Sequence, residues 1–309
     1  MLFKTRSFFY FLFLYSLALP SFSSGSLLAC HQLLPRLPNV GKAVCEAAEL
    51  KDSGARSVQG RPIWVTDLTP ARAQLKILVV GGIHGDEMSA TSLVMHWIAQ
   101  AQREQAIQGH EAVTQWRFIP VLNPDGLLAK RPKRVNARGV DLNRNFPTPN
   151  WARETRIYWE QRVKKDPRRY PGPRALSEPE SRFLHAEIER MKPDLVVSVH
   201  APYGVLDFDG PHQPPSRLGR LYLDQVGVFP GSLGNYSGIH KGVPVVTIEL
   251  ASALKTPREV EMRQMWRELR QWMRKTLVQP GEAEPTRPPV SSGLPALVPP
   301  SPQSGDDSQ

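Results

Sequence analysis

The residues with the clearest chemical potential lie in one stretch, residues 75–87, with the sequence LKILVVGGIHGDE. Its apolar run, residues 77–80, predicts a buried strand that two glycines end. His84 and Glu87 follow at a strand-to-helix turn, where both side chains can point at one ion. Imidazole nitrogen and carboxylate oxygen suit zinc, which in catalytic sites takes about three protein ligands and keeps one position open. The stretch therefore predicts two ligands of a metal site whose third ligand lies elsewhere in the chain.

Two further strand ends supply the missing groups. His200 ends the apolar run DLVVSVH, and Glu249 lies near the end of VPVVTIEL. In open α/β sheets, ligands gather at the carboxyl ends of strands. A carboxylate in an apolar strand is costly to bury without a partner, so Glu249 requires a cation or a chemical role. We expect His84, Glu87 and His200 to bind zinc and Glu249 to act as a base.

This set of residues matches metal-assisted hydrolysis of an amide. Zinc lowers the pKa of its bound water to about 7 and polarises the scissile carbonyl. A nearby carboxylate takes the proton of the water and returns it to the leaving amine. A guanidinium aimed at the carbonyl oxygen stabilises the negative charge that develops there, and another can bind a substrate carboxylate. The basic loop, residues 130–146, offers Arg134, Arg138, Asn143 and Arg144, although spacing alone leaves an ordinary solvated loop open.

The elements that position these residues alternate between strand and helix. This order predicts an α/β domain with a mixed, mostly buried sheet. Strands are expected at residues 63–67, 77–80, 116–122, 194–200 and 243–250. Helices are expected at residues 87–101, 177–191 and 257–277, and residues 147–173 are expected to form a surface insertion.

The N-terminus is typical of a secretory signal peptide. Two basic residues precede the apolar run FFYFLFLYSLAL, and small residues follow it. The alternative is an uncleaved membrane anchor, but the apolar run is short for a membrane span and no other run is long enough. The expected location is therefore the periplasm or the exterior of the cell.

Cys30 and Cys45 lie close together after the signal. In an oxidising compartment, a disulfide is the simplest prediction. The sequence LLAC ending at Cys30 also resembles a bacterial lipobox, in which this cysteine would be acylated. The apolar core ends well before Cys30, and Cys45 would then be unpaired, so the sequence favours the disulfide.

The composition of the 309-residue chain adds a broad constraint on partners. The formal net charge of +10 favours an acidic partner, such as carboxylate-rich peptides, nucleic acid or anionic lipid. No nucleic-acid recognition motif accompanies the basic clusters, so nucleic acid is not expected. Residues 280–309 are rich in Pro, Ser, Gly and Glu, which predicts a disordered tail.

The motifs GGIHGDE, NPDG, GVDLNRNF, SVH and TIEL occur in that order and resemble the zinc carboxypeptidase family of carboxypeptidase A. The resemblance covers about residues 57–276 and implies a mixed eight-stranded sheet flanked by helices, with one zinc ion per chain. The resemblance implies that His84, Glu87 and His200 are the zinc ligands and that Glu249 is the general base. It also implies that Asn143 and Arg144 clamp the terminal carboxylate of the substrate, and that Arg134, or else Arg138, polarises the carbonyl.

Within that family, NARGVDLNRNFP, HAPYGVLDFDGP and PGSLGNYSG resemble the murein peptide amidase branch. The resemblance implies hydrolysis of the γ-D-glutamyl–diaminopimelate bond in carboxylate-rich cell-wall peptides. Tyr203, Asp207 and Asp209 are candidates to line the pocket and bind the ammonium of the diamino acid, with ordinary loop residues as the alternative. Tyr236 is a further substrate-binding candidate, although it lies too close to Glu249 to match the flexible active-site tyrosine of pancreatic carboxypeptidases.

The predicted organisation has four parts: a signal peptide at 1–26, a segment with the disulfide at 27–56, a catalytic domain at 57–279 and a tail at 280–309. Three other functions stay open. One is a deacylase of the aspartoacylase or succinylglutamate desuccinylase type, which shares the HxxE and DLNR elements. Another is a carboxypeptidase for basic or aromatic C-terminal residues. The third is a cell-wall binding module without catalysis, which the intact ligand set disfavours.

Overall fold

The computed structural model describes residues 24–109 and 112–278, so most of the predicted signal peptide and the whole predicted tail lie outside the described residues. The strands of the main sheet are β1 Lys51–Arg56, β2 Pro62–Leu68, β3 Leu75–Val80, β4 Thr114–Ile119, β5 Leu195–His200, β6 Val205–Asp209 and β9 Val245–Glu249. The helices are α1 Ser24–Leu33, α2 Lys42–Ala47, α3 Met88–Gln108, α4 Pro124–Leu127, α5 Trp151–Ile157, α6 Pro179–Met191 and α7 Glu259–Met273.

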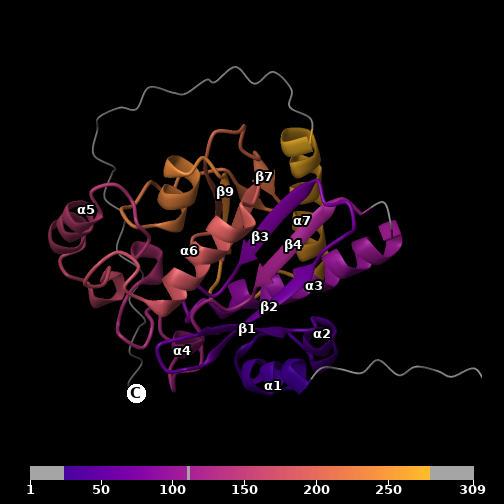
Figure 1. Cartoon of the computed structure of the whole chain (residues 1–309), viewed down its shortest axis with the longest axis horizontal. Coiled ribbons are helices and arrows are strands. Elements are labelled where there is room, and N and C mark those ends of the chain that lie inside the picture. Colours follow the sequence, from indigo (N-terminus) through magenta and orange to yellow (C-terminus); the bar gives the residue numbers. More distant parts are fainter. Residues whose placement is uncertain (1–23, 110–111, 279–309) are drawn as a thin grey trace, which may run out of the picture.

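The main sheet has the strand order β1-β2-β4-β3-β5-β9-β6 (Figure 1). Its four inner strands are parallel, whereas β1, β2 and β6 are antiparallel to their neighbours. The mixed α/β fold predicted from the sequence is confirmed, but the count of eight strands is wrong because the described residues form seven. The remaining candidates, β7 Arg217–Leu218 and β8 Leu221–Tyr222, pair with each other, and Leu223 makes one isolated bridge to Leu206 of the edge strand.

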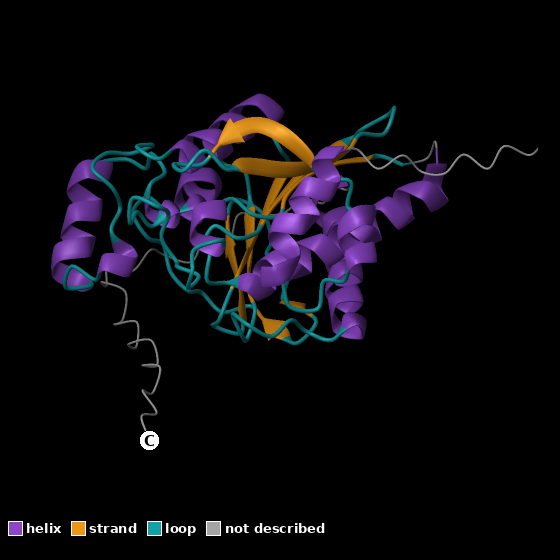
Figure 2. Cartoon of the chain, turned by 90° about the horizontal axis from the view of Figure 1, so that it is seen from below, coloured by secondary structure: helices purple, strands orange, loops and turns teal. Residues whose placement is uncertain are grey.

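Two helical layers cover the sheet because alternate side chains of each inner strand point to opposite faces (Figures 1 and 2). Ile77 and Val79 of β3 belong to the core shared with α3 and α7, whereas Leu78 and Val80 belong to the core shared with α6. This burial on both faces explains why the inner strands are nearly continuous apolar runs. Because β3, β5 and β9 run parallel, their carboxyl ends lie side by side at one edge of the sheet.

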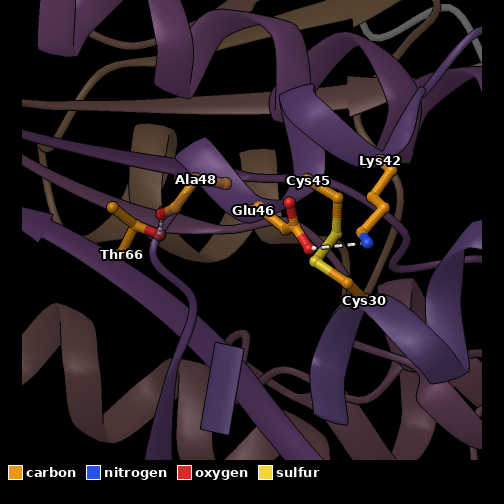
Figure 3. The surroundings of a disulfide bond; sticks show 6 residues. All are labelled: Cys30, Lys42, Cys45, Glu46, Ala48 and Thr66. Atoms are coloured by element: carbon orange, nitrogen blue, oxygen red, sulfur yellow. Dashed lines mark hydrogen bonds and ion pairs between the residues drawn. A yellow bond between two sulfur atoms is a disulfide. The ribbon is translucent and has the colours of Figure 1, made fainter. Parts of the chain in front are cut away.

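The N-terminal segment is part of the same unit as the sheet. Cys30 in α1 and Cys45 in α2 form a disulfide, with their Cα atoms 5.7 Å apart (Figure 3). Next to it, the hydroxyl of Thr66 in β2 donates a hydrogen bond to the carbonyl of Ala48. The predicted boundary between residues 56 and 57 falls between β1 and β2, which pair in one sheet. A sulfur bonded to Cys45 is not free for acylation, so the structure agrees with the disulfide and not with the lipobox alternative.

The predicted surface insertion, residues 147–173, contains helical structure. It holds α5, a helical turn at Tyr158–Arg162 and a second short turn at Pro167–Arg169. Figure 1 places α5 at the end of the molecule farthest from α3. Within the residues that the structure describes, no helix is long and apolar enough to cross a bilayer.

Candidate metal centre

His84, Glu87 and His200 meet at the carboxyl end of the parallel strands. Each of the three residues is at most 4% exposed, and their potential ligand atoms all lie within 4.8 Å of one another. The Nδ1 atom of His84 lies 2.7 Å from Oε1 of Glu87, and the Nδ1 atom of His200 lies 2.9 Å from Oε2 of the same carboxylate. The two Nδ1 atoms are 3.2 Å apart. The structure thus brings together the three ligands that the sequence predicts, and we call them the ligand cluster.

The turn that carries His84 requires glycine for a steric reason. A Cβ atom on Gly85 would lie 2.2 Å from the backbone of Gly126, which belongs to the NPDG turn after β4. The side chain of Asn123 accepts a hydrogen bond from the nitrogen of Gly126 and holds that turn in place. Close packing of these two turns explains why a glycine follows His84, and it places the NPDG turn next to the ligand cluster.

The outer nitrogens of both imidazoles also have partners. The Nε2 atom of His84 lies 3.1 Å from Oδ1 of Asp141, and the Nε2 atom of His200 lies 3.0 Å from the hydroxyl of Ser198. Such contacts fix the orientation of a metal-binding histidine and direct its other nitrogen to the metal. Asp141 lies in GVDLNRNF but was not among the predicted site residues. Its partner is not evident from the sequence, because His84 lies in a turn 57 residues earlier in the chain.

The electrostatics suit a cation at the centre of the cluster. Burial opposes the ionisation of Glu87, but the two histidines outweigh it and lower the pKa of this carboxyl well below its usual range. Burial lowers the pKa of His200, which favours the neutral imidazole that a metal requires. Burial also opposes the ionisation of Asp141, yet Arg134 and His84 hold its pKa well below the usual value. Two imidazoles and one carboxylate form a donor set that fits zinc.

Glu249 lies directly beside the cluster. It is the register partner of His200 across β5 and β9, and it is 7% exposed. Its Oε2 atom is buried and makes no hydrogen bond within the described part of the chain. Burial, reinforced by the charge of Glu87, raises the pKa of this carboxyl well above its usual value. A buried carboxylate oxygen without a partner, next to three metal donors, fits a group that accepts a proton at a zinc site.

Arg134 is the arginine that reaches the cluster. Its Nε and Nη2 atoms donate to Oδ2 of Asp141 at 3.1 and 3.0 Å, and its Nη1 atom lies 3.5 Å from Oε1 of Glu87. Burial would lower the pKa of this guanidinium, but the carboxylates of Asp141 and Glu87 outweigh it and raise the pKa further. Arg134 is therefore a fixed, permanent cation at the edge of the cluster.

Arg144 is held by aromatic rings in a short turn, Leu142–Arg144, that Asp141 caps. The centre of its guanidinium lies 4.5 Å from the ring of Phe229 and 5.2 Å from the ring of Tyr158. Its Nε atom is buried and has no hydrogen-bond partner among the described residues. Asn143 beside it accepts a hydrogen bond from the nitrogen of Leu233. The arrangement provides a positioned cation with an available donor, which suits the binding of a carboxylate.

The candidates for ammonium binding lie on β6 and in the loop before it. Burial raises the pKa of Asp207 to about 6. Burial, with repulsion from Asp207, raises the pKa of Asp209 to about 7. Both carboxylates point to the same face of the strand because they are two residues apart. Tyr203 precedes β6 and exposes 44% of its surface.

A comparison with protein families identifies the family of the chain. The model of the zinc carboxypeptidase family matches residues 44–213, which is more than half of the chain. The chain belongs to the zinc carboxypeptidase family. The matched region contains all three members of the ligand cluster, and Glu249 follows it in the sequence.

Individual zinc carboxypeptidase relatives narrow the comparison. Murein peptide amidase A of Escherichia coli strain K12 is 36% identical over 155 residues, which cover 49% of this chain and 59% of that protein. Murein peptide amidase A of Vibrio campbellii is 30% identical over 208 residues, covering 64% of this chain and 78% of that protein. The crystal structure of the murein-tripeptide amidase of Escherichia coli O157 superposes with a TM-score of 0.53 at 26% identity, covering 72% of this chain and 91% of that one.

Two predicted substrate-binding residues, Arg138 and Tyr236, make their side-chain contacts away from the ligand cluster. The side chain of Arg138 forms an ion pair with Glu178 at 3.6 Å and lines a separate cavity of about 630 Å³. Asn136 holds this tight turn by accepting hydrogen bonds from the backbone nitrogens of Arg138 and Val140. Because the turn directs Arg138 away from the cluster, the structure supports Arg134 and not Arg138 as the arginine of the site.

Tyr236 is the second such residue. Its hydroxyl lies 2.7 Å from Nδ1 of His185 and donates to Glu189 at 2.8 Å, and both partners belong to α6. Its ring stacks on Phe146 with a centroid distance of 5.7 Å. Burial and Glu189 raise the pKa of this phenol above its usual value. The hydroxyl of Tyr236 thus connects the helical turn Gly234–His240 to α6, and its role in substrate binding stays a prediction.

Proposed function

We propose that this chain is an exported zinc-dependent amidase that hydrolyses the γ-D-glutamyl–diaminopimelate bond of murein peptides. The observation that carries the proposal is the buried, unpartnered oxygen of Glu249 beside three zinc-type donors. The names of the relatives, murein peptide amidase A, support the substrate class. Export rests on the sequence of the first 26 residues, and the Cys30–Cys45 disulfide agrees with an oxidising compartment.

His84, Glu87 and His200 would hold one zinc ion, with Asp141 and Ser198 orienting the two imidazoles. When bound, zinc supplies a Lewis acid and lowers the pKa of water to about 7. Glu249 takes the proton of the attacking water and returns it to the leaving amine. The raised pKa of Glu249 suits a group that must hold this proton during the reaction.

Other side chains of the site bind and orient the substrate. Arg134, fixed by Asp141, stabilises the negative charge on the carbonyl oxygen of the scissile bond. Arg144 holds a carboxylate of the leaving diamino acid between its aromatic supports. Asp207 binds the second ammonium of that amino acid, and this ion pair offsets the cost of burying its charge.

The substrate is tested by incubating the protein with L-Ala-γ-D-Glu-diaminopimelate and following the products by mass spectrometry. We expect the release of diaminopimelate, abolished by a chelator and restored by zinc. Peptides with basic or aromatic C-terminal residues and N-acyl amino acids are the comparison substrates. Faster turnover of either comparison substrate would replace the proposed activity with a general carboxypeptidase or with a deacylase of the aspartoacylase type.

A further inference from the structure

A basic segment of the insertion crosses the rim of the ligand cluster. This segment, residues 166–170, is here called the basic strap, and it contains the helical turn Pro167–Arg169. The carbonyl of Tyr170 accepts a hydrogen bond of 2.8 Å from the nitrogen of Asp141, the residue that orients His84. At its other end, Asp166 caps the turn by accepting from the nitrogen of Arg168 at 2.9 Å. The backbone of the strap is thereby fixed next to the metal centre.

Two side chains of the strap, Arg168 and Arg169, add further contacts. Arg168 forms an ion pair of 2.8 Å with Asp86, the residue immediately before Glu87. The Nη2 atom of Arg169 donates to the hydroxyl of Tyr203 at 3.3 Å. Tyr203 lies three residues after His200 in the sequence, and its backbone N–H group favours the ionised form of Glu249. Arg169 is therefore linked through Tyr203 to the surroundings of the proposed base, Glu249.

The two arginines differ in how their charge is used. Asp86 neutralises Arg168, whereas Arg169 has no carboxylate within ion-pair distance among residues 24–109 and 112–278. The side chain of Arg169 is only partly exposed. A guanidinium that is positioned by a hydroxyl, lacks a counter-ion and lies on a segment tied to Asp141 and Asp86 suits an anionic group of the substrate. Arg144 is proposed to bind a carboxylate of the leaving amino acid, so Arg169 is available for a carboxylate elsewhere in the substrate.

We propose that Arg169 determines specificity by binding a carboxylate on the acyl side of the scissile bond, with Tyr203 as the residue that positions it. The inference rests on the proposed function. In the γ-linked substrate, the α-carboxylate of D-glutamate lies on that side, separated from the attacked carbonyl by the Cα, Cβ and Cγ atoms of the glutamate. This subsite distinguishes a γ-glutamyl peptide from an ordinary peptide, which has a neutral amide and a side chain in place of that carboxylate.

The test compares two substrates, L-Ala-γ-D-Glu-diaminopimelate and the same peptide with the α-carboxylate of glutamate converted to an amide. For the wild-type protein we expect kcat/KM to be roughly tenfold higher for the carboxylate substrate, as for one charge-assisted hydrogen bond. Arg169→Ala should remove this preference, mainly through KM, while the amide substrate changes less than about twofold. Arg169→Lys should restore part of it, because the charge remains but the forked geometry is lost.

Arg162→Ala is the matched control, since Arg162 is an exposed arginine of the same insertion. It should leave the substrate preference unchanged, and zinc content should be equal in all variants. Equal losses on both substrates in Arg169→Ala, or an unchanged preference, would overturn the inference. A wild-type protein that prefers the amide substrate, or cleaves both equally, would do the same. Failure to release diaminopimelate from either peptide would instead reject the proposed function, and this inference with it.

Discussion

The carboxylate of Asp141 connects two functional side chains that come from different parts of the chain. One oxygen faces Nε2 of His84, and the other accepts two hydrogen bonds from Arg134. Since the same residue also caps the turn that carries Arg144, a single buried carboxylate organises His84, Arg134 and Arg144, which we propose as metal ligand, carbonyl-binding cation and carboxylate clamp. Its own pKa is held well below the usual value, so it remains ionised in this role.

Replacing Asp141 with asparagine should weaken zinc binding. The amide is neutral, and its NH₂ group cannot accept from Arg134 while its oxygen faces His84. We expect zinc affinity to fall by roughly 10–100-fold, the usual effect of losing an outer-shell partner. Competition with a chelator of known affinity measures this change. Asp67→Asn, which breaks an ion pair with Arg117 on β2 and β4, is the control, and unchanged affinity in Asp141→Asn would show that His84 needs no such partner.

At the scale of elements, strand β6 holds two carboxylates whose pKa values are raised by burial. Such a strand is a poor candidate for prediction from sequence, because VLDFD alternates apolar and acidic residues within a loop-rich region. The inner strands were predicted because burial on both faces requires continuous apolar runs. The alternation in β6 instead places Leu206 and Phe208 on the face that joins the apolar core, and Asp207 and Asp209 on the opposite face.

The buried charge on β6 predicts a pH-dependent stability. The pKa of Asp209 is about 7 in the folded chain, against an ordinary value of 3.8. The folded state therefore binds more protons than the unfolded state between about pH 4 and 7, and stability falls as pH rises through this window. A gap of about 3 pKa units corresponds to at most about 4 kcal/mol. Asp209→Asn should be more stable than the wild type at pH 8 and nearly equal to it at pH 4.

Urea unfolding of the metal-free protein at both pH values measures the effect. Glu160→Gln, at an exposed position in the insertion, is the control and should follow the wild type. The account of Asp209 would be wrong if its asparagine variant showed the same loss of stability between pH 4 and pH 8 as the wild type.

The site was predictable to a different extent in its strands and in its loops. His200 and Glu249 end β5 and β9, and His84 and Glu87 lie in the turn that follows β3, so the register of a parallel sheet fixes where they meet. Arg134 and Arg138 lie in one loop, and only the turn held by Asn136 decides which of them faces the cluster. Sequence spacing contains no information on such side-chain hydrogen bonds, and this limit also explains why Asp141 and Arg169 were missed.

At the scale of the whole molecule, the Cys30–Cys45 disulfide joins α1 to α2 beside the sheet. It closes a loop with a sequence separation of 15 residues, for which chain entropy gives about 3 kcal/mol of stability. The Cys30→Ala, Cys45→Ala double variant should therefore unfold about 6–12 °C below the wild type. Activity at 25 °C should persist, because the disulfide holds the N-terminal helices and supplies no side chain to the site. An unchanged melting temperature would mean that packing alone fixes this segment.

The central claim is that four side chains from distant parts of the chain form one zinc-dependent catalytic site. Its most direct test is Glu249→Gln, measured by zinc content per chain and by release of diaminopimelate from L-Ala-γ-D-Glu-diaminopimelate. The account predicts about one zinc ion per chain in both proteins and a loss of turnover of roughly 10²–10⁴-fold in the variant, because glutamine cannot accept a proton. Turnover equal to that of the wild type at equal zinc content would contradict it.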